Sequence, residues 1–272
     1  MRVAYLGPEG TNSHEAALRH YRDGAVLVPY PDIATVIAAA ATGLVDEAIV
    51  PIENSTEGSV TVTVDLLIAG EAPPIVGETV VPVRHHLVAR PGTRLTDVER
   101  VVSIPQATAQ CRGFLRERLP GAQLFPALSS AAAVAACVHS SSTAAIGTEA
   151  AAELYGMAIV AADIQDSVAN ATRFVSLGNR RPAPTGQDRT SIVFSFRNDR
   201  AGSLVGALTP FATRGINLSK IESRPTKAEL GQYHFLIDCE GHEQDSAVAA
   251  ALAEVRELTV GLTILGAYPR AV

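Results

Sequence analysis

The sequence has few cysteines and no arrangement of side chains typical of a metal site. Its cysteines are an odd number, Cys111, Cys137 and Cys239, and they lack metal-ligand spacing. We therefore expect reduced thiols in or near the core of a cytoplasmic protein. Adjacent His85 and His86 would point to opposite faces of an expected strand and form a poor ligand pair. The sequence thus predicts no metal, and nothing in it requires a cofactor.

Basic clusters and long apolar runs are also absent. The net charge is −6 with no run of Lys or Arg, which argues against nucleic acid as a partner. No stretch approaches the roughly 18–20 apolar residues that cross a bilayer. The chain passes from Met1 through a short apolar segment to Gly7 and Pro8, which is too short for a signal peptide. Neither a phosphate loop nor a dinucleotide glycine fingerprint occurs. We expect a cytoplasmic protein that binds no membrane.

What is present in the first 180 residues is an alternation of short apolar strands and alanine-rich helices. This pattern predicts an α/β fold with a mostly parallel sheet covered by helices. The extended segment 75–89 can carry the chain from one α/β lobe to another. We expect strands at 3–6, 25–29, 47–52, 79–89, 101–104, 123–127, 144–147 and 157–161, and helices at 13–21, 33–41, 106–119, 130–139 and 148–155.

The pattern changes after a Pro-rich linker at 180–188. Strands are expected at 191–196, 216–223, 232–239 and 259–268, with amphipathic helices at 202–214 and 245–258. The order βαββαβ is that of the ferredoxin-like fold. We expect two domains, at 1–180 and at 188–272.

Polar residues gather where expected strands end or helices begin. These clusters are Gly7–His14, Pro51–Gly58, Ser103–Gln110, Ser129–Ala131 and Asn170–Phe174. Hydroxyls, amides and free N–H groups at helix starts attract anions. Arg173 adds a permanent cation that fits a carboxylate. The clusters predict a cleft between two lobes that binds a small, oxygen-rich anion.

Four of these motifs resemble those of prephenate dehydratase, in that family's order. They are Tyr5-Leu-Gly-Pro-Glu-Gly-Thr-Asn-Ser13, Pro51-Ile-Glu-Asn-Ser-Thr-Glu-Gly58, Ser103-Ile-Pro-Gln-Ala-Thr-Ala-Gln-Cys111 and Asn170-Ala-Thr-Arg-Phe174. The second region is similar to an ACT regulatory domain through Gly202-Ser-Leu-Val205 and Ile221-Glu-Ser-Arg-Pro225. The resemblance covers essentially the whole chain. It implies a bacterial, monofunctional enzyme with a two-lobed catalytic domain that resembles periplasmic binding proteins.

This chain departs from the family pattern at a few positions. Asn12 stands where Phe is usual, Ile104 where His is usual, and Ser203 where Ala is usual. Ile104 excludes any role for an imidazole at that position, and Asn12 alters how the first loop packs on a substrate. None of these changes removes a residue that the family is thought to need for its chemistry.

The resemblance implies a lyase that dehydrates and decarboxylates prephenate to phenylpyruvate in phenylalanine biosynthesis. Thr172 would donate or relay a proton, Phe174 would pack on the ring, and the other polar residues would orient the anion. Glu53 is interpreted as structural. The implied catalytic residues are Thr172, Asn54, Ser103 and Gln110, and the implied substrate-binding residues are Thr11, Ser55, Arg173 and Phe174.

The resemblance also implies allosteric regulation by phenylalanine, bound between paired ACT domains of a homodimer or homotetramer. The implied effector residues are Gly202, Ser203, Leu204, Val205, Asn217, Leu218, Glu222, Ser223, Arg224 and Pro225. Two alternatives remain open at this point. One is an arogenate dehydratase, and the other is a non-catalytic solute or amino-acid sensor.

Overall fold

The computed structural model describes residues 1–167, 169–197, 200–227 and 231–271. The chain forms two compact units. One comprises Met1–Val36, Ile49–Val60 and Val80–Phe174, and the other Ile37–Ala48, Thr61–Thr79 and Val175–Val272. Within the described ranges, no helix is both long and apolar enough to cross a membrane.

The first sheet has the strand order β2-β1-β3-β11-β5, with β4 paired to β3. β1 and β2 are parallel, as the alternating pattern predicts. The strands are β1 (Arg2–Leu6), β2 (Val26–Tyr30), β3 (Glu47–Asn54), β4 (Gly58–Ser59), β5 (Ile75–Pro82) and β11 (Ala171–Gly178), and the helices of this part are α1 (Asn12–Tyr21), α2 (Ile33–Ala41) and α3 (Thr61–Ile68), with a 3₁₀ turn at Arg22–Gly24.

The second sheet has the order β10-β6-β9-β7-β8 and lies entirely in the first unit. Its elements are β6 (His86–Ala89), β7 (Arg100–Ser103), β8 (Gln123–Pro126), β9 (Thr143–Gly147), β10 (Ala158–Ala161), α4 (Pro105–Gln110), α5 (Arg112–Arg118), α6 (Ser130–Ala135) and α7 (Glu149–Leu154), with a 3₁₀ turn at Leu95–Asp97.

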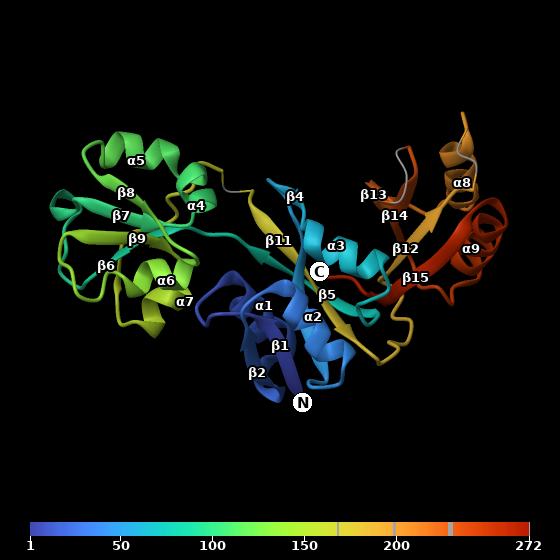
Figure 1. Cartoon of the computed structure of the whole chain (residues 1–272), viewed down its shortest axis with the longest axis horizontal. Helices are drawn as coiled ribbons and strands as arrows, with labels where there is room; N and C mark the ends of the chain where they lie inside the picture. The colour runs from blue at the N-terminus through green and yellow to red at the C-terminus, as the bar shows by residue number, and fades with distance from the viewer. Residues whose placement is uncertain (168, 198–199, 228–230, 272) are drawn as a thin grey trace. The chain divides into compact units, whose positions relative to one another are not determined.

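Helices cover both faces of this second sheet (Figure 1). Leu87 and Ile146 pack with Leu115 of α5 on one face, while Val88 and Ala145 pack with α6 and α7 on the other. Neighbouring residues of a strand therefore point into two different cores, one on each face of the sheet. This explains why the sequences of these strands are continuous apolar runs.

The predicted two-lobed α/β architecture is confirmed, but several details differ. The second sheet is mixed, since β7 runs parallel to β8 and β9 whereas β6 is antiparallel to β9 and β10. The expected strand 79–89 is two strands in two sheets, so 75–89 does connect them.

The expected helix 106–119 breaks at Cys111, whose φ and ψ of −118° and 20° leave the helical region. The expected helix 130–139 ends at Ala135, and β11 and α3 were not predicted.

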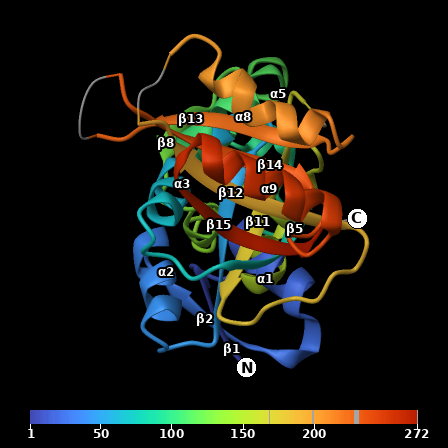
Figure 2. The same cartoon turned by 90° about the vertical axis from the view of Figure 1, so that its right-hand side faces the viewer.

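The C-terminal elements lie in the second unit and have the predicted βαββαβ order. An antiparallel sheet of order β13-β14-β12-β15 carries both helices on one face (Figure 2). Phe194 and Ile237 of the sheet meet Phe211 and Leu252 of the helices in the core. The elements are β12 (Asp188–Ser195), α8 (Ser203–Ala212), β13 (Leu218–Pro225), β14 (Tyr233–Glu240), α9 (Ser246–Leu258) and β15 (Val260–Pro269).

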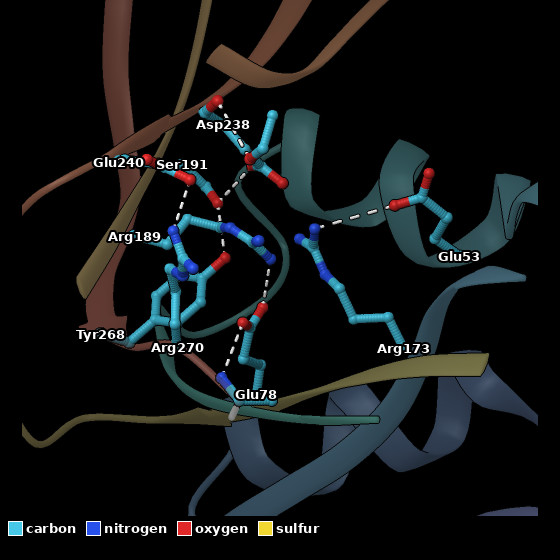
Figure 3. A network of polar contacts seen from close by, with 11 residues as sticks. Glu53, Glu78, Arg173, Arg189, Ser191, Asp238, Glu240, Tyr268 and Arg270 are labelled. Carbon is cyan, nitrogen blue, oxygen red and sulfur yellow. Dashed lines mark hydrogen bonds and ion pairs between the residues drawn. The ribbon is translucent and has the colours of Figure 1, made fainter. Parts of the chain in front are cut away.

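Buried polar contacts tie β5 to this C-terminal sheet inside the second unit (Figure 3). Arg189 Nη1 lies 2.5 Å from Glu78 Oε2, and the Ala271 N–H donates to Glu78 Oε1 at 2.9 Å. Ser191 Oγ donates to Asp238 Oδ1 at 2.6 Å and lies 2.7 Å from the Tyr268 hydroxyl. Because Glu78, Ser191, Asp238 and Tyr268 are buried, the loss of one of these bonds would cost about 1–3 kcal/mol.

Gly266 of β15 stands where this packing leaves no room for a side chain. A Cβ there would lie 2.1 Å from the Ile75 carbonyl oxygen, a backbone atom that cannot rotate away. We expect Gly266→Ala to destabilise the fold by about 1–3 kcal/mol, as overpacked sites do. Urea unfolding measures this change, with Gly121→Ala as the control because a Cβ at Gly121 meets nothing within 4 Å. An unchanged midpoint in Gly266→Ala would contradict the packing of β15 against Ile75.

Candidate active site

The polar clusters that the sequence singles out converge on one cavity of about 360 Å³ in the first unit. Each of the five clusters contributes to its lining, although the clusters are spread over 168 positions, from Gly7 before α1 to Phe174 in β11. The lining consists of Leu6, Gly7, Thr11, Asn12, Ser13, Pro31, Pro51, Asn54, Glu57, Val60, Val83, His85, Ile104, Gln106, Ala107, Gln110, Leu128, Ser129, Ser130, Asn170, Thr172 and Phe174.

Asn54, the last residue of β3, connects two of these clusters. Its Nδ2 donates to Thr172 Oγ1 at 2.9 Å and to Asn170 Oδ1 at 2.8 Å. Its Oδ1 accepts from the backbone N–H groups of Thr56 and Glu57, at 2.9 and 3.1 Å. The turn that follows β3 therefore fixes which end of the amide faces Thr172. Because Thr172 Oγ1 accepts this bond, its own hydrogen is left to be donated elsewhere.

The hydrogen bonds continue from Asn170 to the first turns after β7. Asn170 Nδ2 donates to Gln110 Oε1 at 3.0 Å, and His85 Nε2 lies 2.7 Å from the same oxygen. Gln110 Nε2 donates to Glu57 Oε1 at 3.2 Å, and Gln106 Nε2 donates to Glu57 Oε2. One connected set of side chains thus joins the end of β3 and the residue before β11 to α4, within the first unit.

Helix N-caps position two other parts of the lining. Thr11 Oγ1 donates to the Pro8 carbonyl at 2.9 Å and accepts from the His14 N–H at 3.3 Å, so that it caps α1. Ser129 caps α6 by accepting from the Ala132 N–H at 3.0 Å. Both residues follow the Ser/Thr preference at this position, and the first residues of the two helices, Asn12, Ser13 and Ser130, also line the cavity.

Ser55, Ser103 and Arg173 are expected site residues that the structure places outside this lining. Ser103 is buried and donates to the Ile104 carbonyl at 3.0 Å. Ser55 Oγ accepts from Ala171 N and donates to the Ala169 carbonyl, both at 3.0 Å. The two hydroxyls satisfy nearby backbone groups.

Arg173 lies next to residues of the cavity wall but outside the lining itself. Along β11, Thr172 and Phe174 line the cavity while Arg173 between them does not, since strand side chains alternate in direction. Its Nη1 instead lies 3.7 Å from Glu53 Oε2, and the side chain is only 11% exposed (Figure 3). The role of Arg173 toward a substrate carboxylate and the structural role of Glu53 both stay predictions, and in this structure the two side chains form an ion pair.

His85 and Asn170 line the cavity but were not among the residues predicted to act there. Both are buried, and Asn170 lay within a motif without being given a role. The sequence around His85 does not indicate a role in the site, because its partner Gln110 lies 25 positions away. Two of the three departures from the family pattern, Asn12 and Ile104, also line the cavity.

Burial also affects the pKa values of two histidines, His85, which lines the cavity, and His14 of α1. Desolvation lowers the pKa of His85, and the hydrogen bond with Gln110 opposes that shift. Desolvation likewise lowers the pKa of His14 from 6.5, against the opposing charge of Glu9. The Gly10 N–H donates to His14 Nδ1 at 3.2 Å, which requires that nitrogen to be unprotonated.

A pH dependence of stability follows from His14. With its pKa lowered by folding, the unfolded chain binds the proton more readily, so stability falls as the pH drops below about 6.5. We expect the free energy of unfolding to decrease less between pH 7.5 and pH 5.5 in His14→Gln than in the unsubstituted protein. Urea unfolding at both pH values checks this, and an equal or larger decrease in the variant would contradict it.

The predicted effector residues lie on the C-terminal sheet and on α8. Gly202 and Ser203 line a cavity of about 720 Å³, Val205 is 69% exposed, and Leu204 packs on the core. Asn217 is exposed just before β13, which begins at Leu218. These residues share one domain, but they do not all line one cavity.

The Glu-Ser-Arg-Pro segment lies on β13, where Ser223 and Pro225 are exposed. Glu222 pairs with Lys220 at 3.2 Å. Arg224 Nη2 lies 2.7 Å from Asp65 Oδ1 of α3, also in the second unit. Hydrogen bonds from Lys227 and then Arg224 hold the pKa of Asp65 below its usual value.

In the part of the chain that the structure describes, no group of three or more His, Cys, Asp or Glu side chains could hold a metal ion. The three cysteines are buried free thiols, and burial raises the pKa of Cys111 to about 12.

The fold and the cavity define an α/β ligand-binding domain joined to a ferredoxin-like domain, and comparisons with known proteins identify both. The model of the ACT domain matches residues 190–257. The model described as prephenate dehydratase matches residues 3–182. The chain therefore belongs to the prephenate dehydratase family, and it is a lyase.

Individual relatives agree with this family. A prephenate dehydratase of Mycobacterium bovis is 41% identical over 99% of this chain and 87% of its own length. A bifunctional chorismate mutase/prephenate dehydratase of Stutzerimonas stutzeri is 39% identical over all of this chain and 74% of its own length. The crystal structure of the Arthrobacter aurescens prephenate dehydratase in complex with L-Phe is 38% identical, with a TM-score of 0.91, over all of this chain and 90% of that one.

Proposed function

We propose that this enzyme converts prephenate into phenylpyruvate, with loss of water and carbon dioxide, in phenylalanine biosynthesis. The observation that carries the proposal is the hydrogen bond from Asn54 Nδ2 to Thr172 Oγ1 at the wall of the cavity. It leaves the Thr172 hydrogen available to a substrate oxygen. The catalytic domain would extend over residues 1–180 and the regulatory domain over 188–272, in a cytoplasmic protein.

The reaction needs one proton and no oxidant. Prephenate carries a ring carboxylate, a pyruvyl carboxylate and a ring hydroxyl. When the bond from the ring to its carboxylate breaks, the electron pair enters the ring and the hydroxyl leaves. A proton converts the departing hydroxide to water, and the ring becomes aromatic. Thr172 acts as the positioned donor to that hydroxyl, which is the kind of help that contributes about 10²–10⁴-fold in rate.

Neutral donors would bind the substrate. Among the described residues that line the cavity there is no Lys or Arg. The amides of Gln106 and Gln110 each have one N–H left after the bond to Glu57. Together with the N–H groups near Thr11 and Ser129, they supply hydrogen bonds instead, at about 0.5–1.5 kcal/mol each. Phe174, which is 1% exposed, provides an apolar wall for the ring. Arg173 and Glu53 hold the start of β11 from its other face.

Turnover of prephenate by the purified chain tests this function. We expect phenylpyruvate, followed by its absorbance in alkali, to form far faster than in the uncatalysed reaction. No acceleration above that background would refute the proposed function.

Arogenate is the alternative substrate, since it differs from prephenate by an amine in place of the ketone. The donors of the lining suit both molecules, because prephenate and arogenate share the two carboxylates and the ring hydroxyl. A comparison of kcat/KM for the two decides between them. We favour prephenate because the relatives described above are named for it. Those relatives are enzymes, so they do not support the non-catalytic sensor.

Phenylalanine is the proposed effector, bound where ACT domains of two or four copies of this chain pair. The support is a relative of known structure that holds L-Phe, together with the exposed Val205 beside Gly202 and Ser203. Regulation requires that phenylalanine bind one conformation more tightly than another. Calorimetric titration with and without a substrate analogue tests this coupling. Equal affinities would exclude it, and a monomer in sedimentation experiments would exclude the paired site.

A further inference from the structure

Two buried residues outside the predicted catalytic set, His85 and Asn170, are connected to Thr172 through hydrogen bonds. His85 Nε2 lies 2.7 Å from Gln110 Oε1, and Asn170 Nδ2 donates to that same oxygen at 3.0 Å. Asn170 Oδ1 accepts from Asn54 Nδ2 at 2.8 Å, and Asn54 donates to Thr172 Oγ1 at 2.9 Å. All five residues line the cavity and lie in the first unit.

The direction of every hydrogen bond in this series of side chains is set by the residues at its two ends, Asn54 and Gln110. At one end, two backbone N–H groups bind Asn54 Oδ1, so its Nδ2 must face Asn170 and Thr172. At the other end, Glu57 accepts from the side-chain NH₂ group of Gln110, so Gln110 Oε1 must be the acceptor. Asn170 lies between the ends and accepts from Asn54 while it donates to Gln110. Each amide therefore has one orientation only.

His85 completes the arrangement as a neutral donor. Gln110 Oε1 can only accept, so His85 carries its hydrogen on Nε2. Backbone bonds hold His85 in place, because its N–H donates to Gln165 Oε1 at 2.9 Å and its carbonyl accepts from Ile164 N at 2.8 Å. His85 and Asn170 are 5% and 4% exposed, so water does not readily replace these bonds.

We propose that His85 and Asn170 are positioning residues, which orient Gln110 and Asn54 and thereby direct the Thr172 hydrogen into the cavity. This inference rests on the proposed function and adds to it. A misdirected donor affects the reacting geometry more than it affects binding. The effect should therefore fall on kcat rather than on KM.

The test compares variants that keep or remove the donor at each position. We expect His85→Leu to lower kcat for prephenate by roughly 10- to 100-fold with KM changed by less than about 3-fold. His85→Gln, which retains an N–H donor, should recover most of the loss. Asn170→Asp, similar in size but unable to donate to Gln110, should behave like His85→Leu. His86→Leu is the matched control, because His86 is a buried neighbour that does not line the cavity.

A second experiment distinguishes a positioning role of His85 from general damage to the structure. In a Thr172→Ala background, His85→Leu should lower kcat by less than about 2-fold, since the group that it orients is gone. Full additivity, or equal activity of His85→Leu and His85→Gln, would overturn the proposal. If the unsubstituted chain does not turn over prephenate at all, the proposed function fails instead. If His85→Leu does not fold, Asn170→Asp and His85→Gln still decide the question.

Discussion

Replacing Thr172 by alanine is expected to lower kcat for prephenate by about 10²–10⁴-fold, while Thr172→Ser retains most of the activity. The loss corresponds to about 2.7–5.5 kcal/mol of transition-state stabilisation. The reason is that Thr172 Oγ1 accepts from Asn54 and so presents its hydrogen to the cavity. Serine keeps this hydroxyl, and alanine removes it. Steady-state formation of phenylpyruvate by both variants checks the prediction.

Thr172→Val is the control for shape, because it preserves the branched side chain in β11 without the hydroxyl. It should be as slow as Thr172→Ala, with KM close to that of the unsubstituted enzyme. Full activity in either variant would rule out Thr172 as the proton donor. A loss confined to KM would assign it to binding alone.

The second large effect is expected for Asn54→Asp, with kcat reduced by roughly 10²–10³-fold. The introduced carboxylate can still accept from the Thr56 and Glu57 N–H groups, so the turn after β3 is kept. It cannot donate to Thr172, however, and would instead accept the Thr172 hydrogen and turn it away from the substrate. It would also face Asn170 Oδ1, which is an acceptor.

Two readouts distinguish this account from simple disruption of the fold. The thermal unfolding midpoint of Asn54→Asp should fall much less than that of Asn54→Ala, which loses the turn contacts as well. Its relative activity should also rise as the pH is lowered, because a protonated carboxyl regains a donor. Activity within about 3-fold of the unsubstituted enzyme at neutral pH would show that the bond from Asn54 does not matter.

Much of the architecture was predictable because it depends on short-range patterns. The spacing of apolar residues, every second position in strands and every third or fourth in helices, predicted most of the strands and helices. These include all six elements of the C-terminal domain. The expected helix 33–41 is α2, and Asp32 just before it caps its first turn, since Asp32 Oδ1 accepts from the Thr35 N–H at 2.8 Å. β11 was missed because its motif was interpreted as the end of a strand rather than its beginning. Neither Gly nor Pro stands at Cys111 itself, where the helix breaks, although Gly113 follows two positions later.

The site was predictable as a set of polar clusters, but not in its connections. Asn54 and Asn170 bond to each other across 116 positions, and no local pattern encodes such a pair. Once β11 is recognised as a strand, the alternating directions of its side chains place Arg173 on the opposite face from Thr172 and Phe174. His85 was judged only as a metal ligand, whereas the structure gives it a hydrogen bond to Gln110.

The most direct test of the central claim is a crystal structure of Thr172→Val with prephenate bound. The account predicts the substrate in the cavity between Asn54 and Gln110, with its ring hydroxyl pointing at residue 172 and its ring against Phe174. A substrate bound elsewhere, or one whose ring hydroxyl faces away from residue 172, would contradict it.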